Sequence, residues 1–488
     1  MHGRGQVAVS AVGVARERRN AVHRFDRRYR APEQPNRSPV SSRRDFAEQH
    51  GPRGEGGRGE SAAAGLVLAA APTTIVAVSP RSLINLNWLN LLVAQMQMAF
   101  GAFLSAHLAA EQWSTQQIGV ALTISTGTAM LFQVPGGALV DAIHSKRRAA
   151  AVGIMVIASA AILIGVSPHK YPVFLAEALQ GAASCVLGPA IAAITLALTH
   201  QDTLGERFGR NVRFSAIGSM VAAALMGAIG YWFSNRAVFF LSTLSAIAAL
   251  AAVRAIPEQD IEEAPERTDH EAVIPRRHRT RPEDPKWKVA LNPVLLTFAA
   301  CVALFQLGNA AVLPIAAAAA QRADGHVVYL LIVAWTIIPQ ALAAWMSPHL
   351  GRAAHHWGRR PILLLGFAPL PLRALLFAGI ANPYAMVFVQ ALDGISAAVV
   401  GMIVPLVVAD ITRRYGRFNL AMGVVGLAVG VGAAVSTSFA GAVADRFGNT
   451  MAYAALAAAG LAACLLVWLA LPETGQRRRH HQIKARVA

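Results

Sequence analysis

The sequence predicts an all-α membrane protein with about twelve transmembrane helices, built as two related bundles of six. Of its 488 residues, 55% are hydrophobic and only 14% are charged. A soluble domain of this length carries more surface charge, so the composition indicates a lipid bilayer as solvent. Two further observations agree: apolar runs of membrane-spanning length recur from Leu83 onward, and the second half of the chain repeats patterns of the first.

Each apolar run is long enough for a helix to cross a hydrocarbon core of about 30 Å. Helices are expected because a helix satisfies its own backbone hydrogen bonds in lipid. We place the spans near residues 83–107, 115–140, 148–167, 172–199, 212–234, 237–255, 292–320, 326–350, 361–380, 383–410, 419–443 and 451–471.

Basic residues give the expected orientation. The formal net charge is +18, but the charge lies in the N-terminal tail and between spans, whereas a nucleic-acid binder would group it on a soluble face. Positive charge marks the cytoplasmic side, so we expect both termini in the cytoplasm, in a bacterial inner (plasma) membrane. The basic clusters, found in every second loop, are Ser145–Arg148, Arg207 with Arg210 and Arg213, residues 256–291, Arg359–Arg360 and Arg413–Arg414.

The domain organisation follows from these runs. Residues 1–80 form a basic, disordered extension with a short apolar stretch at 62–78, because so polar a segment cannot bury enough surface to offset its ordering entropy. The sequence leaves open whether residues 62–78 span the membrane and whether the extension belongs to the native protein. The remaining parts are an N-terminal bundle (81–256), a charged cytoplasmic linker (257–291), a C-terminal bundle (292–472) and a basic cytoplasmic tail (473–488).

The two bundles match each other at a nearly constant offset. Ala178–Gly181 aligns with Ala391–Gly394, and Gly137 aligns with Gly351 at almost the same separation along the chain. Several registers that agree on one offset indicate a duplication of six spans. This architecture belongs to a large class of transporters that bind substrate at the midplane between the two halves.

The loops after the second and eighth spans resemble those of the major facilitator superfamily. The family pattern is Gly-x-x-x-Asp-Arg-x-Gly-Arg-Arg; the first loop keeps the Gly and the Asp, and the second keeps both Gly residues and the Arg pair but has His355 in place of the acid. The resemblance, over Leu83–Leu471, implies the family's fold and alternating access. The gating candidates are Gly137, Asp141, Lys146, Arg147, Gly351, Gly358, Arg359 and Arg360.

Asp141 stands near a predicted helix end, where a carboxylate can cap a neighbouring helix N-terminus or pair with a basic residue and so hold one conformation closed. The first Gly of each loop lets two helices approach closely. The alternative interpretation of the basic cluster is topological: Lys146, Arg147 and Arg148 then only mark the cytoplasmic side.

An ionisable residue inside a span costs several kcal/mol and is therefore a candidate site, and three such residues stand out. They are Glu177 in the fourth span, Arg373 in the ninth and Asp393 in the tenth. The estimated depths of Arg373 and Asp393 agree within a turn, so the two can pair and couple transport to protons. A static structural pair is the alternative.

Uncharged polar residues favour a lined cavity. Asn87, Asn90 and Gln97 share one face of the first predicted helix, and in the superfamily the first, fourth, seventh and tenth helices line the central cavity. Interhelical hydrogen bonding is the competing interpretation. The other cavity candidates are Gln180, Gln306, Asn309 and Gln390.

Other chemistry is not indicated. Cys185, Cys301 and Cys464 lack metal-ligand spacing, and the His355–His356 and His480–His481 pairs read as solvated loop residues. No nucleotide-binding loop or hydrolase pattern occurs, so we expect neither an enzyme nor an ATP-driven pump, and no metal or cofactor.

The predicted function is therefore secondary active transport of a small organic solute, coupled to protons, by a monomer in the lipid bilayer, with export favoured over uptake. The segment Gly218–Gly227 lacks the Pro-after-Gly signature of drug antiporters. A non-transporting membrane sensor or scaffold on the same fold is the alternative.

Overall fold

A computed structural model describes residues 79–262, 286–316, 328–380, 382–413, 415 and 417–474. These belong to one unit of the chain, Thr74–Ala488. The predictions for the apolar stretch 62–78, for residues 263–285 of the linker and for the tail from residue 475 lie outside the described residues.

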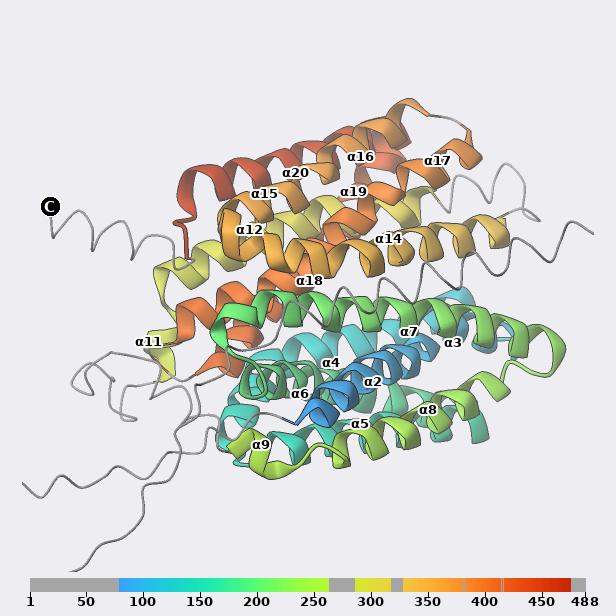
Figure 1. Cartoon of the computed structure of the whole chain (residues 1–488). Coiled ribbons are helices and arrows are strands. Elements are labelled where there is room, and N and C mark those ends of the chain that lie inside the picture. Colours follow the sequence, from blue (N-terminus) through green and yellow to red (C-terminus); the bar gives the residue numbers. More distant parts are fainter. Residues whose placement is uncertain are drawn as a thin grey trace, which may run out of the picture. The chain divides into compact units, whose positions relative to one another are not determined.

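The N-terminal half consists of helices that begin where the sequence offers a cap. Ser79, Ser114 and Ser145 each accept a backbone hydrogen bond at a helix start, and Ser114 with Gln117 forms a capping box. The helices are α2 (Pro80–Gln97), η2 (Met98–Phe100), α3 (Ala102–Ala110), α4 (Thr115–Ala142), α5 (Lys146–Val166), α6 (Lys170–Ala197), η3 (Gln201–Thr203), α7 (Leu204–Trp232), α8 (Ala237–Arg254) and the short α9 (Glu258–Glu262) (Figure 1).

The C-terminal half follows the same plan after the short α11 (Lys286–Ala290). Asn292 and Asn382 cap helices that start with Pro, which has no N–H to leave unpaired at that position. The helices are α12 (Pro293–Asn309), α14 (Val328–Trp357), α15 (Arg359–Phe367), α16 (Pro369–Gly379), α17 (Pro383–Val389), α18 (Ala391–Thr412), α19 (Phe418–Phe447) and α20 (Asn449–Ala470).

Eleven helical stretches of the described residues are long and apolar enough to cross a membrane, and the 30-residue α14 lies where the eighth span, 326–350, is predicted. The prediction of an all-α membrane protein with twelve spans in two six-helix bundles is confirmed. One buried core joins the N-terminal helices, and two others lie mainly in the C-terminal half.

Several helices extend beyond the apolar runs that predict them. Arg207, Arg210 and Arg213 lie in the first turns of α7, not in a loop, and His355 and His356 lie in the last turn of α14. The prediction that these five residues are loop-borne is wrong. A helix can continue past the hydrocarbon core when its ends pack on protein or reach water, so an apolar run marks the lipid-facing length and not the helix end.

Three predicted spans are built from two helical pieces. The first divides around Gly101, between η2 and α3; the ninth divides at Ala368, before Pro369; and the tenth divides at Gln390, between α17 and α18. Pro369 lacks the N–H that would continue the backbone ladder. Backbone hydrogen bonds continue across two of these points, from the Ala368 N–H to the Leu364 carbonyl and from the Gln390 N–H to the Met386 carbonyl.

The two halves meet at the end of the bundle that carries Lys146, Arg147, Arg359 and Arg413, which we call the basic end. There α4 packs on α19, and α14 packs on α7 (Figure 1). Gly137 lies so close to the Asn419 carbonyl that a Cβ would clash, and the same holds for Gly351 against the Gly205 carbonyl. Further from the basic end, Gly119, Gly127 and Gly441 face open space.

Candidate functional site

A buried arginine, a carboxylate and an amide meet in the C-terminal half. Arg373 on α16 is 2% exposed and pairs through Nη1 with Oδ1 of Asp393 on α18. Its Nη2 donates to Asn309 Oδ1 at 2.8 Å and to the Asn309 carbonyl at 3.4 Å, at the end of α12. The cluster therefore ties the seventh, ninth and tenth spans together and contains three residues that the sequence analysis singled out.

The break in the tenth span places Asp393 in the first turn of α18. A helix N-terminus carries partial positive charge, so Asp393 faces both a cation and a favourable dipole. The uninterrupted apolar run 383–410 predicts one continuous helix with Asp393 near its middle and gives no sign of this second source of stabilisation.

Glu177 has the opposite surroundings. It is fully buried on α6, and neither carboxylate oxygen has a hydrogen-bond partner among the described residues, because the neighbouring Ser125 hydroxyl donates to Gln180 instead. An unpaired carboxylate ion is costly to bury, whereas a neutral carboxyl costs much less. Glu177 is therefore suited to take up and release a proton.

The amide candidates form local hydrogen bonds. Gln180 accepts from Ser125 on α4 at 2.7 Å and donates to Ser184 at 3.2 Å, whereas Asn90 donates to the Leu86 carbonyl of its own helix. Gln390 is 2% exposed, and its Oε1 lacks a partner among the described residues. Gln306 contacts Asn309 at 3.5 Å, and Gln97 ends α2 just before the break at Gly101.

Asn87 lies nearer the basic end than a midplane cavity. Its Oδ1 accepts from Arg207 Nη2 at 2.7 Å, and Arg207 is itself buried. The sequence analysis interpreted Arg207 only as a marker of topology. In the structure it joins α7 to α2.

Asp141 caps α19 at the basic end. Its Oδ1 accepts from the Asn419 backbone at 3.1 Å and from Asn419 Nδ2 at 2.8 Å, and its Oδ2 accepts from the Leu420 backbone at 2.9 Å. Three donors at a helix N-terminus are a strong arrangement for a carboxylate. The contact spans the two halves, so it exists only while α4 and α19 are together.

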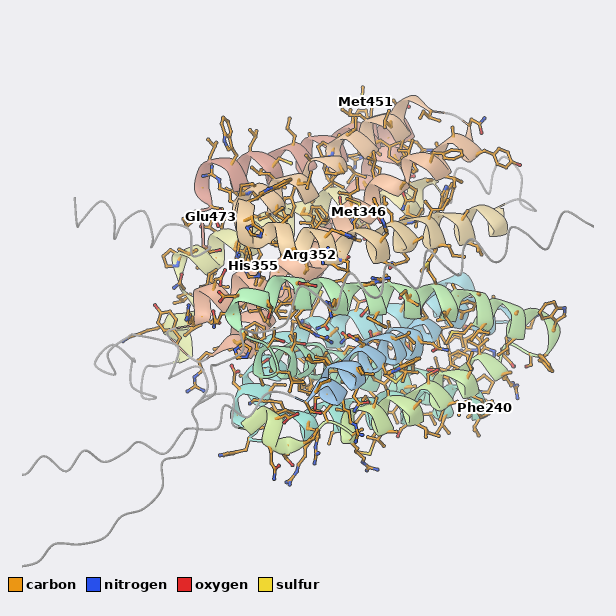
Figure 2. The ribbon with its side chains drawn as sticks, viewed as in Figure 1. Phe240, Met346, Arg352, His355, Met451 and Glu473 are labelled. Carbon is orange, nitrogen blue, oxygen red and sulfur yellow. The ribbon has the colours of Figure 1, made fainter. Side chains whose placement is uncertain are left out.

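The related contact in the other half uses a histidine. Nε2 of His355, at the end of α14, accepts from the Gly205 backbone at the start of α7, at 3.0 Å. Arg352, one turn earlier on α14, contacts Glu206 of α7 at 3.4 Å. Figure 2 shows both labelled side chains beside α7.

The remaining gating candidates serve their own halves. Lys146 Nζ donates to the Val140 and Ile143 carbonyls at 2.6 Å, closing the end of α4. Arg147 donates to the Ile256 carbonyl and to Glu258.

In the other half, Arg359 pairs with Asp410 at 2.9 Å, and the Arg359 and Arg360 backbones donate to Glu473. Gly358 has φ +96° and lies against Glu473, so a side chain there would be both strained and blocked.

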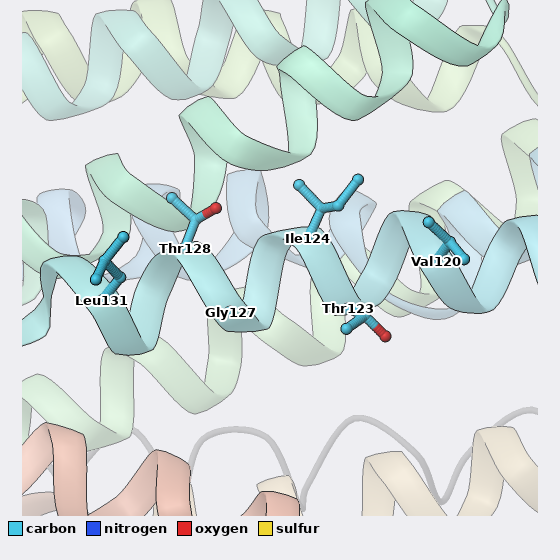
Figure 3. A pocket seen from close by; sticks show the side chains of 6 residues that line it. All are labelled: Val120, Thr123, Ile124, Gly127, Thr128 and Leu131. Atoms are coloured by element: carbon cyan, nitrogen blue, oxygen red, sulfur yellow. The ribbon is translucent and has the colours of Figure 1, made fainter.

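A hollow of about 400 Å³ opens along α4, on the part far from the basic end (Figure 3). Its lining contains none of the predicted cavity residues. The lining residues are Val120, Thr123, Ile124, Gly127, Thr128 and Leu131.

Four residues at the basic end were missed by the sequence analysis: His355, Asn419, Glu258 and Glu473. The repeat offset carries a signal for three of them, since His355 is the repeat counterpart of Asp141, and Glu473 is the counterpart of Glu258 within one position. The repeat gives no signal for Asn419, because its counterpart is Gly205. Both residues take part in the contacts through their backbone N–H groups, which any residue type could supply.

Comparison with known proteins gives one family. The model described as Major Facilitator Superfamily matches residues 86–315 and 296–487. An uncharacterized MFS-type transporter, found in two strains of Mycobacterium tuberculosis, is 34% identical over 407 residues, which cover 82% of this chain and 96% of the relative.

Two further proteins are similar in part or in fold. A puromycin resistance protein of Streptomyces alboniger is 32% identical over 145 residues, or 30% of this chain and 28% of that protein. The solved structure of the proton:xylose symporter XylE, bound to 6-bromo-6-deoxy-D-glucose, matches with a TM-score of 0.59 over 81% of this chain and 96% of that chain. At 14% identity this likeness concerns the fold alone.

Proposed function

The chain belongs to the major facilitator superfamily of membrane transporters, and from this premise we propose that it moves a small organic solute by alternating access, coupled to protons. Family membership places it among multi-pass integral membrane transporters and not among enzymes. The observation that carries the proposed coupling is the contrast between Glu177, buried without a partner, and Asp393, which is partly exposed and paired with the buried Arg373.

Glu177 is the proposed proton carrier. A carboxyl group that is buried without donors stays neutral, and it loses its proton only when movement of α6 or α4 admits water or a cation. Alternation between two conformations supplies that movement. Proton release is thereby linked to the side of the membrane to which the site opens.

Arg373, Asp393 and Asn309 are the proposed core of the solute site. They meet where α12 ends and α18 begins. The arginine's two terminal nitrogens are occupied by Asp393 and Asn309, so the cluster presents a neutral ion pair and amides. A solute that hydrogen-bonds these groups changes the balance between the two conformations.

The basic end is proposed to face the cytoplasm of a bacterial inner membrane, with both termini on that side. In this structure the halves are joined there through Asp141 and His355, which supports an outward-facing state. Export is the proposed direction, and the partial similarity to a puromycin resistance protein supports it.

Proton flux in proteoliposomes tests the proposal. Purified protein is reconstituted with a trapped pH-sensitive dye and challenged with a mixed solute library. Wild type should give a solute-dependent pH change, and Glu177→Gln should reduce it at least tenfold while solute counterflow persists. Asp393→Asn should reduce both. Glu111→Gln, which removes an exposed carboxylate paired with Arg236, is the matched control and should behave as wild type. Coupled flux at the wild-type level in Glu177→Gln would refute the proposed carrier.

A further inference from the structure

The two contacts that join the halves at the basic end are copies of one another. Each involves a glycine on one helix and the first turn of another: Gly137 on α4 lies against Asn419, and Gly351 on α14 lies against Gly205. Gly137 and Gly351 are repeat counterparts, and Gly205 and Asn419 are separated by the same offset. The duplication has therefore preserved the backbone geometry of the contact twice.

The capping group differs between the copies. Asp141 accepts three hydrogen bonds as a carboxylate, whereas His355, its counterpart, accepts one from the Gly205 N–H through Nε2. A ring nitrogen accepts only while it carries no proton, and a doubly protonated imidazole has no acceptor left. The α7 N-terminus also repels a cation, because it is the positive end of the helix dipole.

We propose that His355 is a proton-sensitive latch: the neutral ring holds α7 against α14, and protonation of the ring releases the contact and opens the basic end. The proposal rests on alternation between two conformations and not on proton coupling through Glu177. The Asp141 contact does not involve an imidazole, so the proposed latch is confined to the α7–α14 contact.

Charged and titratable groups on four helices lie near His355 and affect how readily its ring takes up a proton. Glu206 on α7 and Asp202 on η3 favour the charged ring, whereas Arg359 on α15 and His356 on the same helix oppose it. His355 lies beyond the predicted span 326–350, and burial, followed by the charge of Arg359, lowers its pKa below the ordinary 6.5. When the basic end opens, the burial is relieved.

The sign of the effect follows from linkage. The closed state holds His355 with a lowered pKa, so protons bind the open state more tightly, and acid favours opening. The shift begins as the pH on that side falls below about 6.5. One linked proton changes the ratio of open to closed molecules by at most about tenfold per pH unit.

Distance measurements between spin labels test this latch in the full chain without any solute. Labels are attached at Thr203, before α7, and at Trp357, at the end of α14, after replacement of the partly exposed Cys464. As the pH falls from 8 to 5.5, the wild-type distribution should gain a second, longer distance between the two labels, which reports the open basic end. His355→Gln cannot take up a proton and should keep one distribution throughout, and His355→Asp should stay closed at pH 5.5.

A neighbouring histidine supplies the matched control. His356→Gln removes an exposed imidazole one residue away and should keep the pH response, displaced slightly to higher pH because one opposing charge is gone. A wild type without a pH response, a response retained in His355→Gln, or one lost in His356→Gln would each overturn the latch. None of these outcomes bears on Glu177, so failure of the latch is distinct from failure of coupled transport.

Discussion

The fourth and tenth spans carry the same polar positions but place the acid differently. In α6 the order is Glu177 and then Gln180, and at the repeat-related positions of α17 and α18 it is Gln390 and then Asp393. Glu177 and Gln390 are both buried with unpaired oxygens among the described residues. The acidic residue therefore lies one turn further along the helix in the C-terminal copy, whereas the first of the two positions is buried in both copies.

What separates the two acids is a neighbour. Arg373 pairs with Asp393, whereas the repeat-related positions of the N-terminal half hold the uncharged Ser159 and Ala160, and Ser159 donates to the Met155 carbonyl of its own helix. The two copies share their helix geometry, but only the C-terminal copy has a cation beside its carboxylate. Whether a carboxyl group inside the membrane is ionised therefore depends more on a neighbouring cation than on its depth in the bilayer.

The largest expected effect is the loss of stability when the Arg373–Asp393 pair is broken. Arg373→Met leaves Asp393 and Asn309 without their donor and should lower the free energy of unfolding by about 3 kcal/mol, the lower end for a buried pair, because the remaining Asp393 side chain is 25% exposed. Ser159→Ala, at the related position, should cost less than about 0.5 kcal/mol. Thermal unfolding in detergent measures both changes.

A double variant sharpens this result. Arg373→Met with Asp393→Asn removes both charges and should regain most of the lost stability, since replacing a buried pair is often nearly neutral. If the Arg373→Met change alone were silent, Asp393 would not depend on its cation, and the contrast between the two spans would fail.

The next effect tests whether the geometry is shared. Gly181 lies against Ser125 of α4, and Gly394 lies against Pro339 of α14, with contacts too close for a Cβ in both cases. Gly181→Ala and Gly394→Ala should therefore cost similar amounts, about 1–3 kcal/mol each. Gly188→Ala on α6, where a Cβ meets open space, is the control and should be neutral. A large cost at one glycine and none at the other would show that the copies have diverged in packing.

The smallest expected effect concerns Glu258, the acidic residue that follows the sixth span. A hydrogen bond from Ser145, with the charges of Arg147 and Arg148, holds the pKa of Glu258 below its ordinary 4.5. A lowered pKa stabilises the fold above pH 4.5, and that stabilisation is lost as the pH falls through the lower folded value.

Unfolding from pH 7 to pH 3 checks this linkage. Wild type should exceed Glu258→Gln in stability by a constant amount above about pH 5.5, and the difference should shrink below 4.5. A difference that is independent of pH would mean that the carboxylate charge does not matter at this position.

The sequence predicted the helices, the duplication and the depth of the charged residues, because these follow from apolar run length and offset. It placed Arg373 and Asp393 at depths within a turn of each other, and the structure pairs them. It missed the breaks at Gly101 and Gln390, since these depend on packing between helices. It also missed the burial of Arg207 and the cap by His355, because helix ends beyond the apolar runs are set by tertiary contacts.

Infrared spectroscopy of the carboxyl groups tests most directly whether Glu177, which is buried without a hydrogen-bond partner among the described residues, carries a proton. A protonated carboxyl has a carbonyl stretch separate from the bands of carboxylates and amides. At neutral pH the account predicts such a band in wild type and in Asp393→Asn, and its absence in Glu177→Gln. A band that survives Glu177→Gln and disappears in Asp393→Asn would contradict the account and assign the proton to the paired acid.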